Sequence, residues 1–150
     1  MPEEDYNRTK GVLESRSPFN YSTYTPMFTD FTHDFYRLIR VTGSGAKYMY
    51  IGQIHAETKA KHGRGVRLYQ DGQFEEGFWF HDKQQGTGRC IFKRGGLYEG
   101  EFKMDLKHGR GEYLFIDGNR YIGQYVNGKR NGEGTLQYAD GRVDTGVWKD

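Results

Sequence analysis

Glycines recur in this sequence at a fixed spacing of 23 residues, and this feature constrains the fold more than any other. Residues 121–141 align with residues 98–118, and glycine falls on glycine at four positions of the two segments. One further step toward the N-terminus finds the same pattern, with Trp79 in the place of Phe102. A fixed period of this length is typical of architectures that stack one supersecondary unit many times.

The copies account for most of the chain. The first copy differs from the others by two extra residues, which lie between His55 and His62. We expect one repeat domain over residues 47–150, with units at residues 50–74, 75–97, 98–120 and 121–143 and a partial unit at 144–150.

Each unit has the pattern of one antiparallel hairpin. Tyr121, Gly123 and Tyr125 alternate with other residues, which is the two-residue period of a strand. Asn127-Gly128 follows and is the strongest short signal for a hairpin turn, because both central residues need positive φ. Residues 134–138 alternate again and form the returning strand.

The predicted fold class is therefore all-β. Two strands per unit give a single-layer antiparallel meander of about nine strands in residues 48–148, as an open, twisted, groove-forming sheet. Folding about the Asn127-Gly128 turn would place Gly123 opposite Gly134 and Tyr125 opposite Gly132.

Aromatic residues occupy two slots of the repeat, and glycines face them. Strand glycine is costly unless a neighbour uses the missing side chain, and rings can lie over such bare backbone. Residues two apart share a face, so both slots should face the concave side. The aromatic residues are expected to be core or to line a partner groove: Tyr50, Trp79, Tyr98, Phe102, Tyr121, Tyr125 and Trp148. The turn and repeat glycines are Gly52, Gly63, Gly65, Gly77, Gly86, Gly88, Gly100, Gly109, Gly111, Gly123, Gly132 and Gly134.

The unit resembles the MORN repeat (membrane occupation and recognition nexus), which reads roughly Tyr-x-Gly-x-Trp-x-x-Gly-x-x-x-Gly-x-Gly. The resemblance covers residues 50–148 and departs from the pattern at Glu75, Asp105 and Asp144. It implies a scaffold of the kind found in cilia, basal complexes and other cytoskeletal or membrane-junction assemblies. MORN stretches fused to lipid kinases imply, as an alternative, a phosphoinositide-targeting module.

The part of the chain before the repeats has a different composition. Residues 1–29 are polar and predict an extended tail, whose scattered aromatic residues could dock along another surface. These residues are Phe19, Tyr21, Tyr24, Met27 and Phe28.

A short amphipathic helix is predicted over residues 30–41. Phe31, Phe35, Leu38 and Ile39 recur at helical spacing. Such a helix could cover the first edge strand, which would otherwise invite pairing, or it could bind a partner.

Composition excludes several classes of protein. The net charge is +2 and shows no basic stripe of the strength that nucleic-acid binding needs. Cys90 is the one cysteine, so no intrachain disulfide can form, and an intracellular protein of the cytoplasm, cytoskeleton or cilium is expected. The N-terminus has no hydrophobic secretory core.

Catalytic and metal-binding patterns are not found. The five histidines are scattered, and no spacing of Cys and His suggests zinc. No nucleophile, phosphate loop or carboxylate pair can be assigned, so we expect no enzyme activity and no cofactor.

Cations recur in the hairpin loops. Stacked hairpins would align them as a basic rim that could contact anionic lipid headgroups weakly, or that is simply solvated. The residues are Lys59, Lys61, Lys107, Lys129 and Arg130.

The function expected from the sequence is that of a non-catalytic scaffold that binds protein partners within a larger assembly. The alternatives are a lipid-targeting module or an accessory subunit of a large membrane-bound complex. The edge strand Asp144–Lys149 is expected to contact another copy of this chain or another subunit, because one side of it has free backbone groups.

Overall fold

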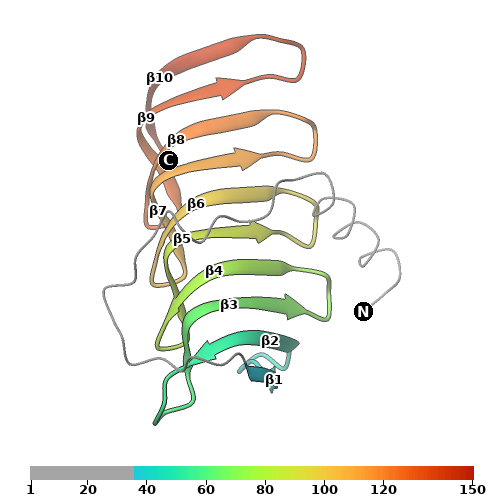
Figure 1. Cartoon of the computed structure of the whole chain (residues 1–150). Helices are drawn as coiled ribbons and strands as arrows, with labels where there is room; N and C mark the ends of the chain where they lie inside the picture. The colour runs from blue at the N-terminus through green and yellow to red at the C-terminus, as the bar shows by residue number, and fades with distance from the viewer. Residues whose placement is uncertain (1–35) are drawn as a thin grey trace.

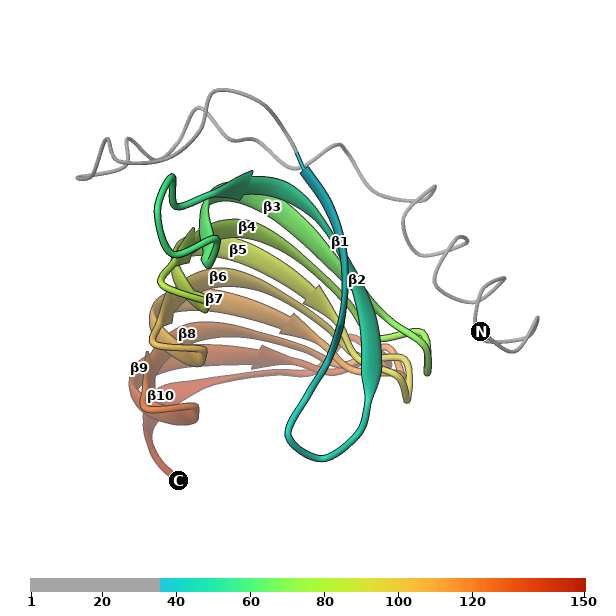
Figure 2. The same cartoon turned by 90° about the horizontal axis from the view of Figure 1, so that it is seen from below.

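The computed structural model describes residues 36–150, which form one antiparallel sheet whose ten strands follow chain order. Figure 1 shows the strands stacked from β1 at one end to β10 at the other, and Figure 2 shows that the sheet bends into an arch. The strands are β1 (Tyr36–Val41), β2 (Lys47–Ile54), β3 (Lys61–Tyr69), β4 (Phe74–Phe80), β5 (Lys83–Ile91), β6 (Leu97–Lys103), β7 (Leu106–Leu114), β8 (Arg120–Val126), β9 (Lys129–Gln137) and β10 (Val143–Lys149).

The predicted all-β meander is confirmed, and the nine strands expected in the repeat domain correspond to β2–β10. The tenth strand, β1, was not predicted. It covers the edge of β2 by antiparallel pairing, with Leu38 opposite Tyr50.

The predicted helix over residues 30–41 is wrong in its second part, because residues 36–41 form β1. Its first part and the predicted tail lie outside the described residues. Leu38 and Ile39 fit helical spacing, but they also alternate: Leu38 packs beside Tyr50, while Ile39 is exposed on the other face. Backbone pairing with the open edge of β2 outweighs the weak local helix preference, as tertiary context often does.

The hairpin turns have the conformation that the sequence predicts. Asn127 and Gly128 have φ of 49° and 87°, so both central residues are in the left-handed region. Met104 and Asp105 adopt the same turn, with φ of 51° and 70°. The turn therefore keeps its conformation although Asp105 stands where the repeat pattern has glycine. Asp tolerates the left-handed region better than most residues do.

The predicted register is confirmed at Gly123, which lies opposite Gly134, and wrong at Tyr125, which lies opposite Arg130. A bulge between Gly123 and Tyr125 shifts the pairing, and Gly132 instead faces Trp148 of β10. The same irregularity occurs in the hairpins β2–β3, β4–β5 and β6–β7. A bulge bends its strand, so one in every hairpin contributes to the arch.

A polar side chain at the bulge satisfies the backbone of the facing strand. Glu101 Oε1 accepts a hydrogen bond from the Arg110 N–H at 3.0 Å, and Gln53 and Gln124 do the same in their own units. The second unit has Phe78 in this slot, and a phenylalanine ring cannot accept this hydrogen bond.

The tyrosine slot defines the concave face. Tyr50 Oη donates to the carbonyl oxygen of Gln53 at 2.7 Å, so the strand bends around the ring on that side. A Cβ on Gly65 would lie 2.2 Å from this hydroxyl oxygen, which shows how closely the ring covers the glycine. Two core clusters lie on the concave face around Tyr50 and Tyr98, and a third lies on the convex face around Ile91.

Candidate protein-interaction face

The predicted groove residues form the floor of the concave face rather than its open surface. Tyr98 is fully buried and packs edge-to-face on Phe102 and Tyr125, with ring centroids 5.1 and 5.3 Å apart. Tyr50 and Trp79 make the same contact at 5.7 Å. Of the predicted set, Tyr50, Trp79, Tyr98, Phe102, Tyr121 and Tyr125 are buried, and Trp148 is half-buried against Tyr121.

A second row of rings on the same face is half-buried and open to a partner. It consists of Tyr69, Phe92, Phe115 and Tyr138, which we call the ring ladder. Phe92 and Phe115 pack against the floor cluster, and Tyr69 packs against Tyr48 at 5.5 Å. Sequence reasoning missed this row, although its members are also spaced by 23 residues, each directly before a loop.

One position of the repeat, which we call the cation slot, holds a basic residue beside the rings in three of the four units. Lys61, Gln84, Lys107 and Arg130 occupy it in successive units. Lys107 Nζ lies 4.8 Å from the centroid of Tyr113, 5.4 Å from that of Tyr125 and 5.6 Å from that of Phe92. Within the described residues no carboxylate pairs with it, and burial lowers the pKa of Lys107.

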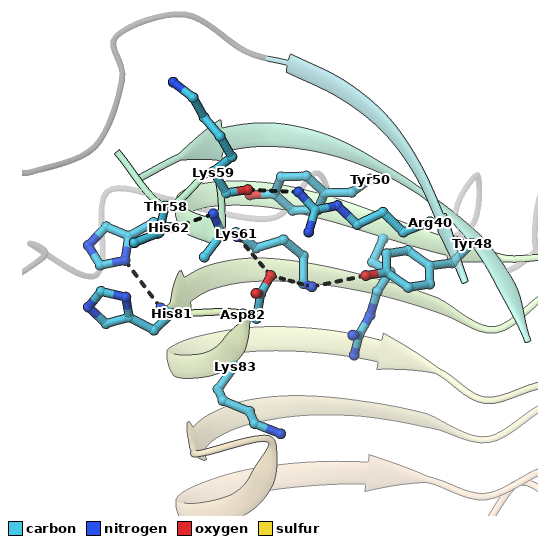
Figure 3. A network of polar contacts seen from close by, with 12 residues as sticks. Arg40, Tyr48, Tyr50, Thr58, Lys59, Lys61, His62, His81, Asp82 and Lys83 are labelled. Atoms are coloured by element: carbon cyan, nitrogen blue, oxygen red, sulfur yellow. Dashed lines mark hydrogen bonds and ion pairs between the residues drawn. The ribbon is translucent and has the colours of Figure 1, made fainter. Parts of the chain in front are cut away.

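The other two cations of this slot have acidic partners. Lys61 is 3% exposed, and its Nζ lies 2.8 Å from Asp82 Oδ1 and 3.2 Å from the hydroxyl of Tyr48 (Figure 3). Arg130 Nε lies 2.5 Å from Asp150 Oδ2, and its guanidinium lies over Tyr121. Burial raises the pKa of Asp82, but the hydrogen bonds from Lys61 together lower it by more than burial raises it. The net shift of this pKa is therefore downward.

The predicted basic rim is therefore not one continuous row. Lys59 and Lys129 are exposed at the rim, whereas the other three members of the predicted set turn onto the concave face. The aromatic rings attract them there, as cation–π contacts do when the cation is partly desolvated.

In the second unit Glu75 stands in the tyrosine slot and forms an ion pair with Arg67 of the preceding strand. Glu75 Oε2 accepts from Arg67 Nε at 2.6 Å, and the Arg67 guanidinium lies 4.7 Å from the Trp79 ring. The same guanidinium lies 5.0 Å from Tyr69, and burial together with the charge of Glu75 raises the pKa of that tyrosine to about 12. Glu75 therefore neutralises Arg67, as Asp82 neutralises Lys61 over the same Trp79 ring, whereas Lys107 has no such partner among the described residues.

Comparison with known families decides what the repeat is. The family model of the MORN repeat matches residues 60–74, 76–97, 98–120 and 121–141, which together make up more than half of the chain. The chain belongs to the MORN-repeat family.

No curated protein matches the sequence. Among solved structures, the chain is similar to the TCP domain of SAS-4 (dCPAP) from Drosophila melanogaster, in complex with a proline-rich motif of Ana2 (dSTIL). The two are 16% identical with a TM-score of 0.40, and the match covers 75% of this chain and 78% of that one.

The glycines of the MORN repeat have two separate uses in this structure. One set lies under tyrosine rings, where any side chain would collide: Gly52, Gly65, Gly100, Gly111, Gly123 and Gly134. A second set faces the bulges with φ between 62° and 102°: Gly63, Gly86, Gly109 and Gly132. Gly77 and Gly88 pack against each other's strand instead, because Glu75 has replaced the ring.

The remaining polar clusters of the MORN sheet do not suggest a reaction. Three histidines pack as rings near the first hairpin loops, with His62 and His81 4.7 Å apart and His55 5.2 Å from each. In the described range no group of His, Cys, Asp and Glu is arranged to hold a metal ion. The described residues include no helix that is long and hydrophobic enough to span a membrane.

Proposed function

We propose that this MORN-repeat protein is a non-catalytic scaffold that holds an acidic segment of a protein partner along its concave face. The setting in the proposal, a cilium, axoneme or other cytoskeletal assembly, rests on the roles of MORN proteins as a family. The proposal itself depends on the geometry of one face of the sheet.

The observation that carries the proposal is the environment of Lys107. Its ammonium lies over four rings that are half-buried or buried, and no carboxylate of the described residues neutralises it. Partial burial of an unneutralised cation costs stability, as its lowered pKa reflects. An acidic side chain of a partner would supply the missing charge and would make a strong, desolvated contact.

The ring ladder sets the spacing that a partner must match. Each unit contributes two strands, so neighbouring ladder rings are about 9.6 Å apart along the stack. An α-helix repeats an apolar residue every seven positions over about 10.5 Å, and a polyproline II helix repeats every third residue over about 9.3 Å. Either a helical or an extended partner segment can therefore place one apolar residue beside each ring.

Capture of partners from a cell lysate, followed by mass spectrometry, tests the proposal. The bait is the full chain, compared with the variants Phe115→Ser and Lys107→Gln. Ile116→Ser is the matched control, since Ile116 is the exposed neighbour of Phe115. The expected result is loss of the same proteins from both Phe115→Ser and Lys107→Gln but not from the control. Equal capture by all four proteins would refute the concave-face proposal.

Lipid targeting is the alternative that the same preparation can test. Two exposed rim cations, Lys59 and Lys129, offer little attraction, because each basic residue near an anionic surface contributes about 1 kcal/mol. Vesicles of phosphatidylcholine with phosphatidylinositol 4,5-bisphosphate should therefore not carry the protein upward in a flotation gradient. Flotation that Lys59→Gln and Lys129→Gln abolish would favour the targeting module instead. Co-purification with detergent-extracted membrane proteins would favour the accessory subunit.

Contact through the edge strand Asp144–Lys149 remains part of the proposal. Among the described strands β10 pairs with β9 only, and its Val147 side chain is exposed. A chain that combines Gly146→Pro with Val147→Lys should lose strand addition while the other units stay folded, because proline cannot donate to a ladder. Size-exclusion chromatography and partner capture of this variant give the measurement, and assembly equal to that of the parent would exclude the edge contact.

A further inference from the structure

The convex face carries an apolar stripe that the proposed concave-face function does not use. Phe74 of β4 lies opposite Ile91 of β5, and Ile91 lies opposite Leu97 of β6. All three are buried, and they form a cluster to which Val66, Leu68 and Leu114 add partly buried surface. The stripe therefore runs across β3 to β6, with its margin on β7.

Phe78 lies farther along β4 on the same face, beyond Glu76, and breaks the rule of the repeat. The equivalent positions in the other complete units hold Gln53, Glu101 and Gln124, whose side chains accept a backbone hydrogen bond at the bulge. Phe78 cannot accept one, yet it is 1% exposed. Val147 occupies the same slot in the last unit and is 71% exposed.

An ion pair on the same face shows the same contrast. Arg89 and Glu76 lie 2.6 Å apart on β5 and β4, and their side chains are 5% and 15% exposed. Arg120 and Glu112 form the corresponding kind of pair on β8 and β7, where the exposed fractions are 42% and 26%. The convex face is therefore shielded from water over β4 and β5 and open from β7 onward.

Within residues 36–150 every strand belongs to the one sheet, so no second layer of the described part lies over the stripe. A single layer provides no covering element of the described residues for the outer side of its convex face. We propose that residues 19–35 of this chain lie along the convex stripe and cover Phe78, Ile91 and Leu97.

The composition of this segment fits the stripe. Between residues 17 and 29 there is no charged residue. An uncharged segment suits the stripe because Arg89 and Glu76 already neutralise each other and need no charged partner. Five large apolar residues fall within ten positions: Phe19, Tyr21, Tyr24, Met27 and Phe28. Each large aromatic side chain buries substantial area, which offsets the entropy lost when the segment is ordered.

The length and the point of attachment of the segment also fit. It leads directly into β1 at Tyr36, and β1 lies on the same end of the stack as the stripe (Figure 1). The five spacings from β1 to β6 amount to about 24 Å. Seventeen extended residues reach about 55 Å, so the segment spans the stripe even if it bends once.

Photocrosslinking in the full chain tests this placement. With p-benzoyl-phenylalanine at Tyr24, crosslinks should fall on peptides that contain Phe78 or residues 89–97. The same probe at Tyr6, outside the segment, is the matched control and should not give them. Crosslinks from Tyr24 to β8–β10 or to the ring ladder would overturn the proposal. In a mixture of labelled and unlabelled protein, crosslinks between the two forms would identify a second copy as the occupant and would also overturn it.

A second measurement follows side-chain accessibility by hydroxyl-radical footprinting. Replacing Phe19, Tyr21, Tyr24 and Phe28 together with serine in the full chain should raise the modification of Phe78 and Leu97 severalfold. Val147 serves as the control for general reactivity, and the floor residue Tyr98 reports that the sheet stays folded. Unchanged protection of Phe78 and Leu97 in this variant would refute the proposal. The result is independent of partner capture, because that function uses the opposite face.

Discussion

The hydroxyl of Tyr98 donates a hydrogen bond to the carbonyl oxygen of Glu101, three residues farther along the same strand, at a distance of 2.8 Å. In a regular strand the Tyr98 side chain stands out from one face of the sheet, whereas the Glu101 carbonyl lies in the plane of the sheet and points toward a neighbouring strand. The bond therefore needs the bulge between Gly100 and Phe102, and it holds the strand in its bent form.

Tyr98→Phe removes this bond and keeps the ring. We expect the free energy of unfolding to fall by about 1 kcal/mol, the usual net value of such a bond. Tyr121→Phe is the matched control with a smaller expected loss, because the Tyr121 hydroxyl lies 3.3 Å from the Gln124 carbonyl oxygen. Urea denaturation of both variants gives the comparison, and an equal loss would show that the hydroxyl does not hold the bend.

The glycine two residues after the tyrosine slot should be required where a ring covers it and dispensable where none does. A Cβ on Gly100 would lie 2.5 Å from Gly111 Cα and 2.7 Å from the Tyr98 hydroxyl oxygen, whereas one on Gly146 would meet nothing within 4 Å. Gly100→Ala should cost about 1–3 kcal/mol, as overpacking does. Gly146→Ala, in the same repeat position, should be neutral or stabilising by about 0.5 kcal/mol. Thermal unfolding of the pair tests this, and equal melting temperatures would contradict it.

Lys107→Gln should leave the fold at least as stable as the parent, because Gln84 already occupies this slot in the second unit. Burial lowers the pKa of Lys107 below its ordinary value of 10.5, so the unfolded state binds the proton more tightly. The folded state of the parent should therefore gain stability as the pH rises through the lowered pKa toward 10.5, and the variant should lack this gain. Denaturation at pH 7 and across this alkaline range measures both effects. A large loss of stability at pH 7 would mean that the cation is structural and not reserved for a partner.

Asp82→Ala should destabilise the protein more than Asp105→Ala, although both residues occupy the same turn position. Each carboxylate accepts a backbone N–H of the unit before it, but Asp82 also pairs with the buried Lys61 while Asp105 pairs with the exposed Lys83. We expect a loss of about 2 kcal/mol for Asp82→Ala and about half of that for Asp105→Ala.

The pair also predicts the acid limb of the stability curve. The folded pKa of Asp82 is below the ordinary 3.8, so its contribution is present above that value and is lost as the pH falls through the folded pKa. Asp82→Ala should flatten the decline of stability below about pH 4, and an unchanged slope there would contradict the assignment.

The sequence predicts the meander and its turns well, because a fixed period determines which strands become neighbours. It does not predict β1, since Leu38 and Ile39 satisfy helical and strand patterns equally and the open edge of β2 decides between them. The exposure of each aromatic row depends on the curvature of the sheet. Curvature comes from the bulges after Gly100 and its equivalents, which the spacing of the glycines does not reveal. For this reason the sequence pattern places Tyr98 among the candidate contact residues and does not identify Phe115 as one.

The direction in which the strands stack has a mechanical consequence. The long axis of the molecule, from β1 to β10, runs across the strands and along their hydrogen bonds (Figure 1). A pulling force between the two ends therefore loads the ladders by peeling, so that the bonds at one end of a strand break before the rest. The force that the sheet withstands is therefore the force needed to separate one pair of strands, and it does not increase with the number of units. In an assembly under load, the sheet would lengthen hairpin by hairpin and would reform each one when the force is released.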